Sequence, residues 1–466
     1  MTKLSYIHSY DVRGVVGEDL TTQEIKNIAK AIASEFDIKK IIIGYDMRES
    51  SKGFYEAMRD EFVQYGINVV SIGLSSTPQL YFATTIHECD MGIIITASHN
   101  PSKYNGMKLC KNNAYPIAYG TGIEKIERCI VEDNYRKYSS GQGEVEEISI
   151  QEEYEKTLLN YIHEFNSKSL RKPIRIAIDY GNGITGVSNK KLLENLEQKG
   201  LIKCVHLFVE PDGTFPNHEA NPIKIENLKD LQKKVVEEKC DFGISFDGDG
   251  DRVGFVDERG EYVAADVMGT FLVEHLAKHN DNFSKFCYDL RSTRKMVETG
   301  EKYSKPSAMT RVGHSHIKKT MVEFGAQFSC ELSGHFYFEE KGARYDDALR
   351  ATIEVICAFS YYNTTFSETV EQFYNNLKSS EINFTVEDAQ EEMDNSINWF
   401  EEIDEIGEFE TTHLDGVMYE NDNFWLNIRK SNTEPLLRVN FEVKNKDEVL
   451  YNTIHAVVEK NLQKED

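Results

Sequence analysis

The clearest fold signal in the chain is Met91-Gly92-Ile93-Ile94-Ile95-Thr96-Ala97-Ser98-His99-Asn100-Pro101. It opens with a short apolar run rich in β-branched residues and bounded by turn formers, which predicts a buried parallel strand. Ser98 then lies where the strand ends, at the edge of an α/β sheet where ligand sites gather. Pro101 prevents regular continuation, and His99 and Asn100 add polar neighbours. Taken alone, the segment is typical of a phosphoryl-carrying serine, of a nucleophile or of an ordinary turn.

The same unit recurs along the chain: an apolar run, then a polar or glycine loop, then a helical pattern. It occurs at residues 38–45, 91–96, 174–179, 241–246 and 286–290. Between these runs, Thr21 and Glu24 form a capping-box pattern, and Ile25, Ile28 and Ile32 continue it as a helical stripe. Alternation of strands and helices predicts parallel α/β modules.

Composition excludes several classes of protein. The 466 residues carry a net charge of −25, from 53 basic and 78 acidic side chains, which argues against nucleic-acid binding. No window is apolar enough for a membrane span, and the first residues lack the apolar core of a signal peptide. The eight cysteines show no CxxC spacing. We therefore expect reduced packing residues and a cytoplasmic protein.

A second polar cluster is Asp247-Gly248-Asp249-Gly250-Asp251-Arg252. Three carboxylates at alternate positions, separated by glycines, can turn toward one hard cation. An EF-hand is the obvious rival, since Glu258 is the twelfth residue from Asp247, but Arg252 stands at the sixth position, where that loop needs glycine. The flanking segments also look like strands. A Mg²⁺ shared with a phosphate oxygen is the favoured interpretation, and a solvated acidic turn is the alternative.

A third cluster lies near the C-terminus, in a loop that a half-buried hairpin is predicted to carry between residues 424–428 and 436–441. The loop contains Arg429, Ser431, Asn432 and Thr433, a planar cation with several donors, which suits a phosphate. The preceding residues 379–428 hold 15 Asp and Glu and no Lys or Arg. We interpret that acidic stretch as solvated exterior.

A fourth cluster, Cys330-Glu331-Leu332-Ser333-Gly334-His335, follows a histidine-rich segment that includes His314. Glu331 and Ser333 are two residues apart and can point side by side at neighbouring hydroxyls of a sugar ring. By itself this pattern is equally typical of a turn at the edge of a core.

We predict three consecutive α/β domains with mixed or parallel sheets, followed by a smaller C-terminal α+β domain, around a central cleft. The predicted boundaries are 1–150, 151–259, 260–368 and 369–466. A helix from Gln151 to about Ser167 introduces the second domain, and a helical stretch over 446–461 closes the fourth. Each polar cluster falls in a different predicted domain, so a small ligand would be enclosed where the four domains meet.

The chain resembles the α-D-phosphohexomutases, most closely the bacterial phosphomannomutase/phosphoglucomutase branch. The likeness spans the whole chain and rests on ordered motifs: Tyr10-Asp11-Val12-Arg13-Gly14, Thr96–Pro101, Tyr104-Asn105-Gly106-Met107-Lys108, Asp247–Arg252, Val312-Gly313-His314, Glu331–His335 and Arg429–Pro435. Two residues depart from the family pattern. Cys330 stands where glycine is usual, and Arg291 stands where several relatives have lysine.

The resemblance implies a phosphoserine at Ser98, with one Mg²⁺ per chain held by that residue, Asp247, Asp249 and Asp251. The phosphoserine would donate to a hexose phosphate, and the resulting hexose 1,6-bisphosphate, intermediate and activator, would turn around and return its other phosphoryl group. Mg²⁺, Arg252 and Lys108 would neutralise the transferring group. The candidates for proton transfer are Arg13, His99 and Lys108, and the sequence does not rank them.

The resemblance also implies a set of substrate-binding residues: Tyr10, Arg291, His314, Glu331, Ser333, His335, Arg429, Ser431, Asn432 and Thr433. Leu332 is apolar, which favours mannose and glucose phosphates over glucosamine phosphate. Phosphoglucosamine mutase and a Mg-dependent sugar-phosphate phosphatase remain the alternatives. A non-catalytic sugar-phosphate binder is the least favoured alternative. We expect small-molecule hexose phosphates as partners, no nucleic acid, no membrane, and a monomer or weak dimer.

Overall fold

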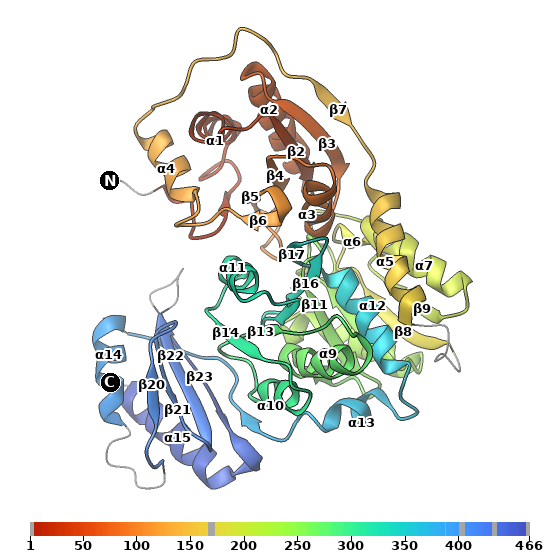
Figure 1. Cartoon of the computed structure of the whole chain (residues 1–466), viewed down its shortest axis with the longest axis vertical. Helices are drawn as coiled ribbons and strands as arrows, with labels where there is room; N and C mark the ends of the chain where they lie inside the picture. The colour runs from red at the N-terminus through yellow and green to blue at the C-terminus, as the bar shows by residue number, and fades with distance from the viewer. Residues whose placement is uncertain (1–3, 166–172, 387, 400–405, 431–435, 463–466) are drawn as a thin grey trace.

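Four β-sheets follow one another along the chain, three of them mixed α/β sheets and the last antiparallel (Figure 1). The computed structural model describes residues 4–165, 173–386, 388–399, 406–430 and 436–462. This architecture confirms the predicted fold class. The exact residues at which one domain gives way to the next stay predictions.

The first sheet contains seven strands in the order β1-β5-β4-β2-β3-β7, with β6 paired to β5. The strands are β1 (Val12–Val15), β2 (Lys40–Tyr45), β3 (Asn68–Leu74), β4 (Met91–Ile95), β5 (Tyr104–Lys111), β6 (Tyr115–Pro116) and β7 (Val145–Glu147). The accompanying helices are α1 (Thr22–Glu35), α2 (Ser51–Gln64), α3 (Thr77–Ile86) and α4 (Ile123–Val131). The predicted capping box of Thr21 and Glu24 opens α1, and Ile25, Ile28 and Ile32 are buried.

Strand β4 is buried at every position, as predicted. It is parallel to β2, as predicted, and antiparallel to β5, so it lies inside a mixed sheet. The loop after Ser98 is short enough to return the chain directly as an antiparallel neighbour. As a result, Lys108 on β5 lies opposite Ile94 on β4, close to the end of the strand that carries Ser98.

The second sheet has the order β12-β11-β10-β8-β9. Its strands are β8 (Ile174–Asp179), β9 (Ile202–Leu207), β10 (Phe242–Phe246), β11 (Val253–Asp257) and β12 (Tyr262–Val263). Its helices are α5 (Gln151–Phe165), α6 (Thr185–Ser188), α7 (Lys190–Gln198) and α8 (Lys229–Glu237). The acidic loop 247–252 joins β10 to β11, which pair antiparallel, so the structure confirms strands rather than EF-hand helices on both sides.

The third sheet has the order β14-β13-β15-β16-β17. Its strands are β13 (Phe286–Asp289), β14 (Ser307–Thr310), β15 (Phe328–Cys330), β16 (Phe336–Glu340) and β17 (Ala343–Asp346). Its helices are α9 (Ala265–His279), α10 (Lys295–Lys302), α11 (His314–Phe324), α12 (Ala348–Phe359) and α13 (Phe366–Glu371). The loop 331–335 joins β15 to β16, which also pair antiparallel.

The fourth sheet has six strands in the order β18-β23-β22-β21-β20, with β19 paired to β23. They are β18 (Leu377–Lys378), β19 (Ile382–Thr385), β20 (Glu410–Thr412), β21 (Val417–Glu420), β22 (Phe424–Lys430) and β23 (Leu436–Val443). The helices are α14 (Ala389–Asn395) and α15 (Glu448–Leu462). Strands β22 and β23 form the predicted hairpin.

That hairpin is more deeply buried than predicted, because both faces of its sheet are covered. One face packs on α15, whose Ile454 and Val458 join the apolar core of this sheet. On the other face, Trp425 is buried, and the guanidinium carbon of Arg294, from the third sheet's layer, lies 4.9 Å from the centre of its ring. The expected alternation of buried and exposed side chains is therefore confined to the start of β23.

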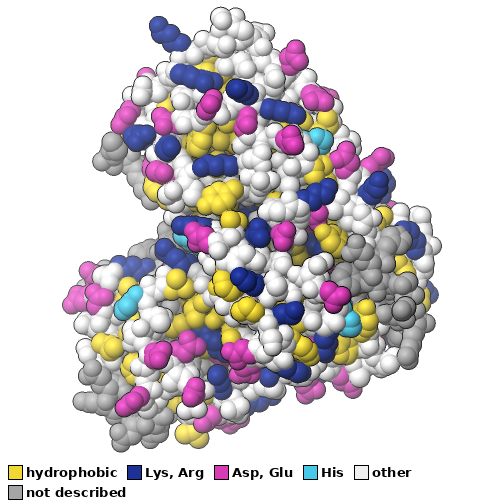
Figure 2. Space-filling view, viewed as in Figure 1, with side chains coloured by type: hydrophobic (Ala, Val, Ile, Leu, Met, Phe, Trp, Pro, Cys, Tyr) yellow, Lys and Arg dark blue, Asp and Glu magenta, His cyan; other side chains and the backbone are white. Residues whose placement is uncertain are grey.

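The first three sheets share an apolar core, and the fourth sheet has a separate one. One apolar cluster runs continuously from the first sheet through the second and third, whereas the fourth sheet has its own. A small cluster of Leu290, Met418 and Trp425 joins the third sheet to the fourth. Figure 1 shows the first sheet at the top and the fourth at the lower left, and the space-filling surface is hollowed between these two lobes (Figure 2). In the described part of the chain, no helix is both long and apolar enough to cross a bilayer.

Candidate active site

Ser98 lies fully buried just after β4, with a backbone φ of +51°. A non-glycine residue in the left-handed region is uncommon and is held there by its surroundings. The Ser98 amide donates to Oγ1 of Thr96 at 2.9 Å, which closes a tight turn at the strand end. The tight turn aims the Ser98 hydroxyl away from its own sheet, toward the second one.

Arg48 fixes the rest of this loop, and sequence reasoning missed it. Its guanidinium donates to four backbone carbonyls, those of Ser98 and Tyr104 at 2.9 Å, Pro101 at 2.9 Å and Asn100 at 2.6 Å. Asp46 lies 3.3 Å from Nε of Arg48 and balances its charge. Arg48 follows the end of β2, the strand next to β4, so the rule that ligand-site residues gather at one sheet edge could have found it.

The acidic loop of the second sheet meets Ser98 directly. The Ser98 hydroxyl donates to Oδ2 of Asp247 at 2.9 Å, and Oδ1 of Asp247 accepts from the backbone amides of Gly250 at 2.9 Å and Arg252 at 3.1 Å. Burial, together with Asp249 and Asp251, raises the pKa of Asp247 well above its ordinary value. The two predicted clusters thus form one site.

Lys108 lies among the remaining carboxylates. Its ammonium donates to Oδ2 of Asp249 at 2.7 Å and to Oδ2 of Asp251. Burial opposes the shift, but Asp249 and Asp251 raise the pKa of Lys108, so it stays charged at neutral pH. Burial likewise opposes the shift at Asp251, where Lys108 and His335 hold the pKa well below its ordinary value.

The acidic cluster has the donor set of a site for a hard divalent cation. Asp247, Asp249 and Asp251 are buried, and one ligand atom from each lies within 4.8 Å of the others. Oδ1 of Asp249 is buried and accepts no hydrogen bond from any described residue, whereas Oδ1 of Asp251 lies 3.4 Å from Nε2 of His335. Orphaned carboxylate oxygens in a buried cluster are costly unless a cation meets them.

The other predicted catalytic side chains surround Ser98. Nδ1 of His99 lies 3.2 Å from the Ser98 hydroxyl, and burial, Arg252 and Arg13 lower the pKa of His99 well below its ordinary value. Arg13 donates to Oδ1 of Asn100 at 2.8 Å, and Nε of Arg252 lies 3.9 Å from Oδ2 of Asp247. The structure therefore brings together every residue predicted for the phosphoryl end of the site.

The loop of the third sheet is joined to the acidic loop through the backbone, because Arg252 and His335 form an isolated antiparallel bridge. Nδ1 of His335 lies 2.9 Å from the Ser333 hydroxyl and 3.2 Å from Oε2 of Glu331. Burial and Arg252 lower the pKa of His335, but Asp251 and Glu331 outweigh them and raise it from 6.5 to about 9. Glu331, Ser333 and His335 thus lie beside the acidic cluster.

At the far side of the site, three arginines converge on Glu381. Oε2 of Glu381 accepts from Arg429 at 2.7 Å and from Arg291 at 3.4 Å, and Oε1 accepts from Arg438 at 3.1 Å. Burial opposes the shift, but these cations lower the pKa of Glu381. Arg291 is also paired with Asp289, at 2.6 Å, so Arg429 and Arg438 are the two guanidinium groups that outweigh the single charge of Glu381. An excess of guanidinium charge suits a phosphate.

One prediction about this region is wrong, and another stays a prediction. The acidic stretch was interpreted as solvated exterior, which is wrong for Glu381, because its carboxylate is enclosed by Arg291, Arg429 and Arg438. Ser431, Asn432 and Thr433 lie outside the described residues, so their part in the loop stays a prediction.

Tyr10 and His314 bring the first and third sheets together. Their rings pack edge to face with centroids 5.0 Å apart. Within the described ranges, neither ring nitrogen of His314 has a hydrogen-bond partner, although both are buried. The two ring nitrogens of His314 are therefore available to a polar ligand.

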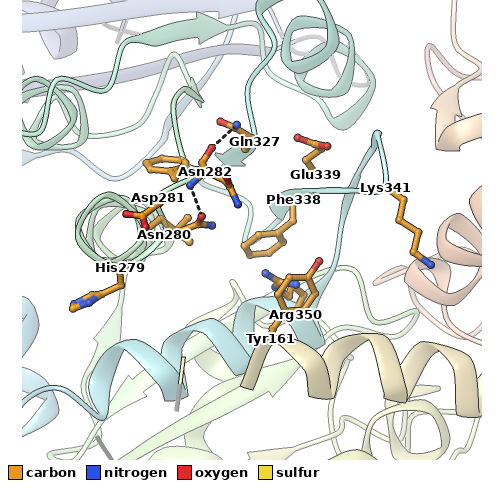
Figure 3. A pocket seen from close by; sticks show the side chains of 12 residues that line it. Tyr161, His279, Asn280, Asp281, Asn282, Gln327, Phe338, Glu339, Lys341 and Arg350 are labelled. Carbon is orange, nitrogen blue, oxygen red and sulfur yellow. Dashed lines mark hydrogen bonds between the residues drawn. The ribbon is translucent and has the colours of Figure 1, made fainter. Parts of the chain in front are cut away.

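Of two cavities in the structure, one borders this site and the other does not. One, of about 610 Å³, reaches from Arg291, Leu332, Ser333 and Glu381 into the junction between the third and fourth sheets. The other, of about 450 Å³, lies among residues of α5, α9, β16 and α12 (Figure 3). Arg350 lines this second cavity but is bonded to Glu354, and none of the lining side chains belongs to the predicted site.

Comparison with known proteins identifies the family. Models of phosphoglucomutase/phosphomannomutase match in order: α/β/α domain I at residues 5–137, domain II at 152–260, domain III at 264–377 and the C-terminal domain at 381–460. The chain belongs to the phosphoglucomutase/phosphomannomutase family. Membership makes it a phosphohexomutase, an isomerase that moves a phosphoryl group on a sugar phosphate.

Individual relatives agree with this assignment. The phosphomannomutase of Methanocaldococcus jannaschii is 35% identical, with 94% of each chain covered. The phosphomannomutase/phosphoglucomutase of Pseudomonas aeruginosa is 32% identical over 96% of this chain and 93% of its own. A crystal structure of a phosphoglucomutase/phosphomannomutase family protein from Burkholderia thailandensis has a TM-score of 0.86 at 26% identity, covering 100% of this chain and 99% of its own.

Proposed function

We propose that this phosphohexomutase interconverts the 6-phosphate and 1-phosphate of mannose, glucose or both, through a phosphoserine at Ser98 and a hexose 1,6-bisphosphate. The observation that carries the proposal is the contact of the Ser98 hydroxyl with Asp247, at 2.9 Å, inside a buried acidic cluster that also contains a lysine. A phosphoryl group esterified there would meet cationic neighbours on several sides. Phosphoryl transfer depends chiefly on positioning and charge neutralisation.

One Mg²⁺ per chain would be held by Asp247, Asp249 and Asp251 together with the Ser98 phosphate, and would neutralise charge during transfer. The orphaned Oδ1 of Asp249 and the close approach of the three buried carboxylates support this assignment. Lys108 and Arg252 add fixed positive charge at the same point. Because the pKa of Lys108 is raised, it keeps its proton and acts as a charge rather than as a base.

His99 is our proposed group for proton transfer. Of Arg13, His99 and Lys108, His99 is the residue in contact with the Ser98 hydroxyl, at 3.2 Å, and its lowered pKa leaves the ring neutral. In this structure the hydroxyl donates its one proton to Asp247, so it would have to turn toward His99 before attack on a phosphoryl group. The neutral imidazole could then accept that proton and return it afterwards. Arg13, bonded to Asn100, would position the loop.

The substrate would be gripped at both ends. Glu331, Ser333 and His335 would bind ring hydroxyls, with Tyr10 and His314 close by, and Arg291 and Arg429 would hold the phosphate that is not reacting. Ser431, Asn432 and Thr433 are proposed to complete that phosphate site. Because the bisphosphate must bind in two orientations, the two ends need separate anchors, which a phosphatase does not need.

The proposal also covers the sugar preference, the cellular compartment, the domain boundaries and the oligomeric state. The relatives' names favour mannose and glucose phosphates over glucosamine phosphate, in agreement with apolar Leu332. All eight cysteines are free and seven of them are buried, which supports a reducing, cytoplasmic setting. We also propose the domain division at residues 150, 259 and 368, and a monomer or weak dimer without nucleic-acid or membrane partners.

A coupled assay tests the function. Mannose 1-phosphate, glucose 1-phosphate and glucosamine 1-phosphate are supplied separately, with catalytic hexose 1,6-bisphosphate and Mg²⁺. We expect the first two to be converted to 6-phosphates and the third to react far more slowly. Preferred conversion of glucosamine 1-phosphate would make the protein a phosphoglucosamine mutase. Release of inorganic phosphate in step with substrate loss would make it a phosphatase.

A further inference from the structure

Helix α3, which belongs to the first sheet's layer, begins against the acidic loop of the second. Thr77, its first residue, is fully buried. The Thr77 amide donates to the backbone carbonyl of Asp249 at 2.9 Å, and the Thr77 hydroxyl donates to Oδ2 of Asp249 at 2.7 Å. One residue from the first layer therefore binds Asp249 twice, through its backbone amide to the carbonyl and through its hydroxyl to the carboxylate.

The helix start holds Thr77 in one orientation. Ser76 and Gln79 form a reciprocal capping box, in which the Gln79 amide donates to the Ser76 hydroxyl at 3.4 Å and the Ser76 amide donates to the Gln79 side chain at 3.1 Å. Pro78 follows Thr77 and restricts the backbone further. The Thr77 hydroxyl is thus presented by a rigid element rather than by a free loop.

The Thr77 bond determines which oxygen of Asp249 faces the cluster. Oδ2 accepts from both Thr77 and Lys108, each at 2.7 Å, whereas Oδ1 is buried and accepts from no described residue. A cation bound in the cluster would therefore meet Oδ1. Lys108 does not fix this arrangement alone, because its ammonium is shared between Asp249 and Asp251.

We propose that Thr77 is a positioning residue for the metal ligand Asp249, and that its hydroxyl sets the affinity of the site for Mg²⁺. The proposal rests on the Mg²⁺ site of the proposed function. Groups that orient a metal ligand without touching the metal typically change affinity by about 10- to 100-fold when removed. Thr77 adds no charge, so its effect comes from holding one carboxylate rotamer.

The test measures Mg²⁺ binding to the full-length protein by isothermal titration calorimetry. Thr77→Val keeps the shape of the side chain and removes the hydroxyl, and Thr77→Ser restores the hydroxyl. Thr352→Val is the matched control, because Thr352 is buried and its hydroxyl bonds only within α12, to the carbonyl of Ala348 at 2.9 Å. If Thr77→Val does not fold, Thr77→Ala takes its place.

We expect Thr77→Val to weaken Mg²⁺ binding about 10- to 100-fold, Thr77→Ser to bind nearly as wild type, and Thr352→Val to bind unchanged. At saturating Mg²⁺, the Thr77→Val enzyme should recover kcat with an unaltered KM for hexose phosphate. In an Asp249→Asn background, Thr77→Val should cause no further loss of affinity. Equal Mg²⁺ affinity in wild type and Thr77→Val overturns the inference, whereas a wild type that binds no Mg²⁺ overturns the metal site of the proposed function instead.

Discussion

The hydroxyl of Ser98 and Oδ2 of Asp247 lie 2.9 Å apart although 149 positions separate them in the sequence. The contact crosses from the first sheet to the second, so neither layer contains the site by itself. Gly248 makes this approach feasible, because a Cβ at that position would lie 2.4 Å from the Ser98 carbonyl oxygen. The phosphoserine loop and the acidic loop can meet only where this residue has no side chain.

Arg48→Lys should lower kcat because one ammonium cannot reach the four carbonyls that the guanidinium holds. A displaced Ser98 loop misaligns the reacting hydroxyl, and a shift of about 1 Å can cost about 100-fold in rate. We expect a loss of that size, measured as kcat at saturating substrate. Arg59→Lys, at a half-buried arginine of α2 that pairs with Asp60, is the control. The prediction fails if both variants turn over like wild type.

Arg429→Ala should mainly raise KM, with a smaller fall in kcat, because Arg429 grips the non-reacting phosphate. A lost hydrogen bond to a charged group costs about 1.5–3 kcal/mol, which corresponds to a KM increase of about 10- to 100-fold. Steady-state kinetics with glucose 1-phosphate provide the measurement. Lys430→Ala removes the neighbouring exposed charge and should leave KM unchanged. An unaltered KM in Arg429→Ala would remove this residue from the phosphate site.

The buried Asp347, at the N-terminus of α12, should make the free energy of unfolding depend on pH. Burial raises its pKa from 3.8 to about 6, although it accepts from Tyr154 at 2.8 Å and from the Arg350 amide at 2.9 Å. The folded state therefore holds this proton more tightly than the unfolded chain. Its stabilising contribution is complete below pH 3.8 and is lost as the pH rises through about 6, a change of about 3 kcal/mol.

Asp347→Asn keeps a capping side chain and removes the titration. We expect the variant to gain in Tm relative to wild type as the pH is raised from acid to neutral, measured by thermal unfolding across that range. A difference in Tm that stays constant with pH, or that falls, would show that Asp347 does not titrate in this way.

The local features of the site could be predicted from the sequence because a short run of neighbouring residues encodes each of them. The apolar strand before Ser98, the alternating carboxylates of 247–251 and the hairpin before Arg429 are confirmed as β4, the β10–β11 loop and β22–β23. Each involves neighbours in sequence, so period, turn chemistry and residue type were sufficient to predict them.

Contacts between distant segments were not predictable in this way. Arg48, Thr77 and Glu381 act through partners far away in the sequence, and their own neighbourhoods look ordinary. Glu381 in particular lies at the start of an acidic stretch whose composition indicates solvent. Its partial burial results from Arg429 and Arg438, which pair across the β22–β23 hairpin, and from Arg291, which the packing of the third sheet on the fourth brings to them.

Phosphopeptide mapping of Ser98 addresses the proposed phosphoryl carrier itself. The protein is incubated with hexose 1,6-bisphosphate, and its intact mass and peptide map are recorded under conditions that preserve phosphate esters. We predict one phosphoryl group per active chain, on the peptide that contains Ser98. The Ser98→Ala variant should remain unmodified, unfold at the same temperature and show no mutase turnover. Fully active enzyme with no modification at Ser98, or near-normal turnover in Ser98→Ala, would refute the mechanism.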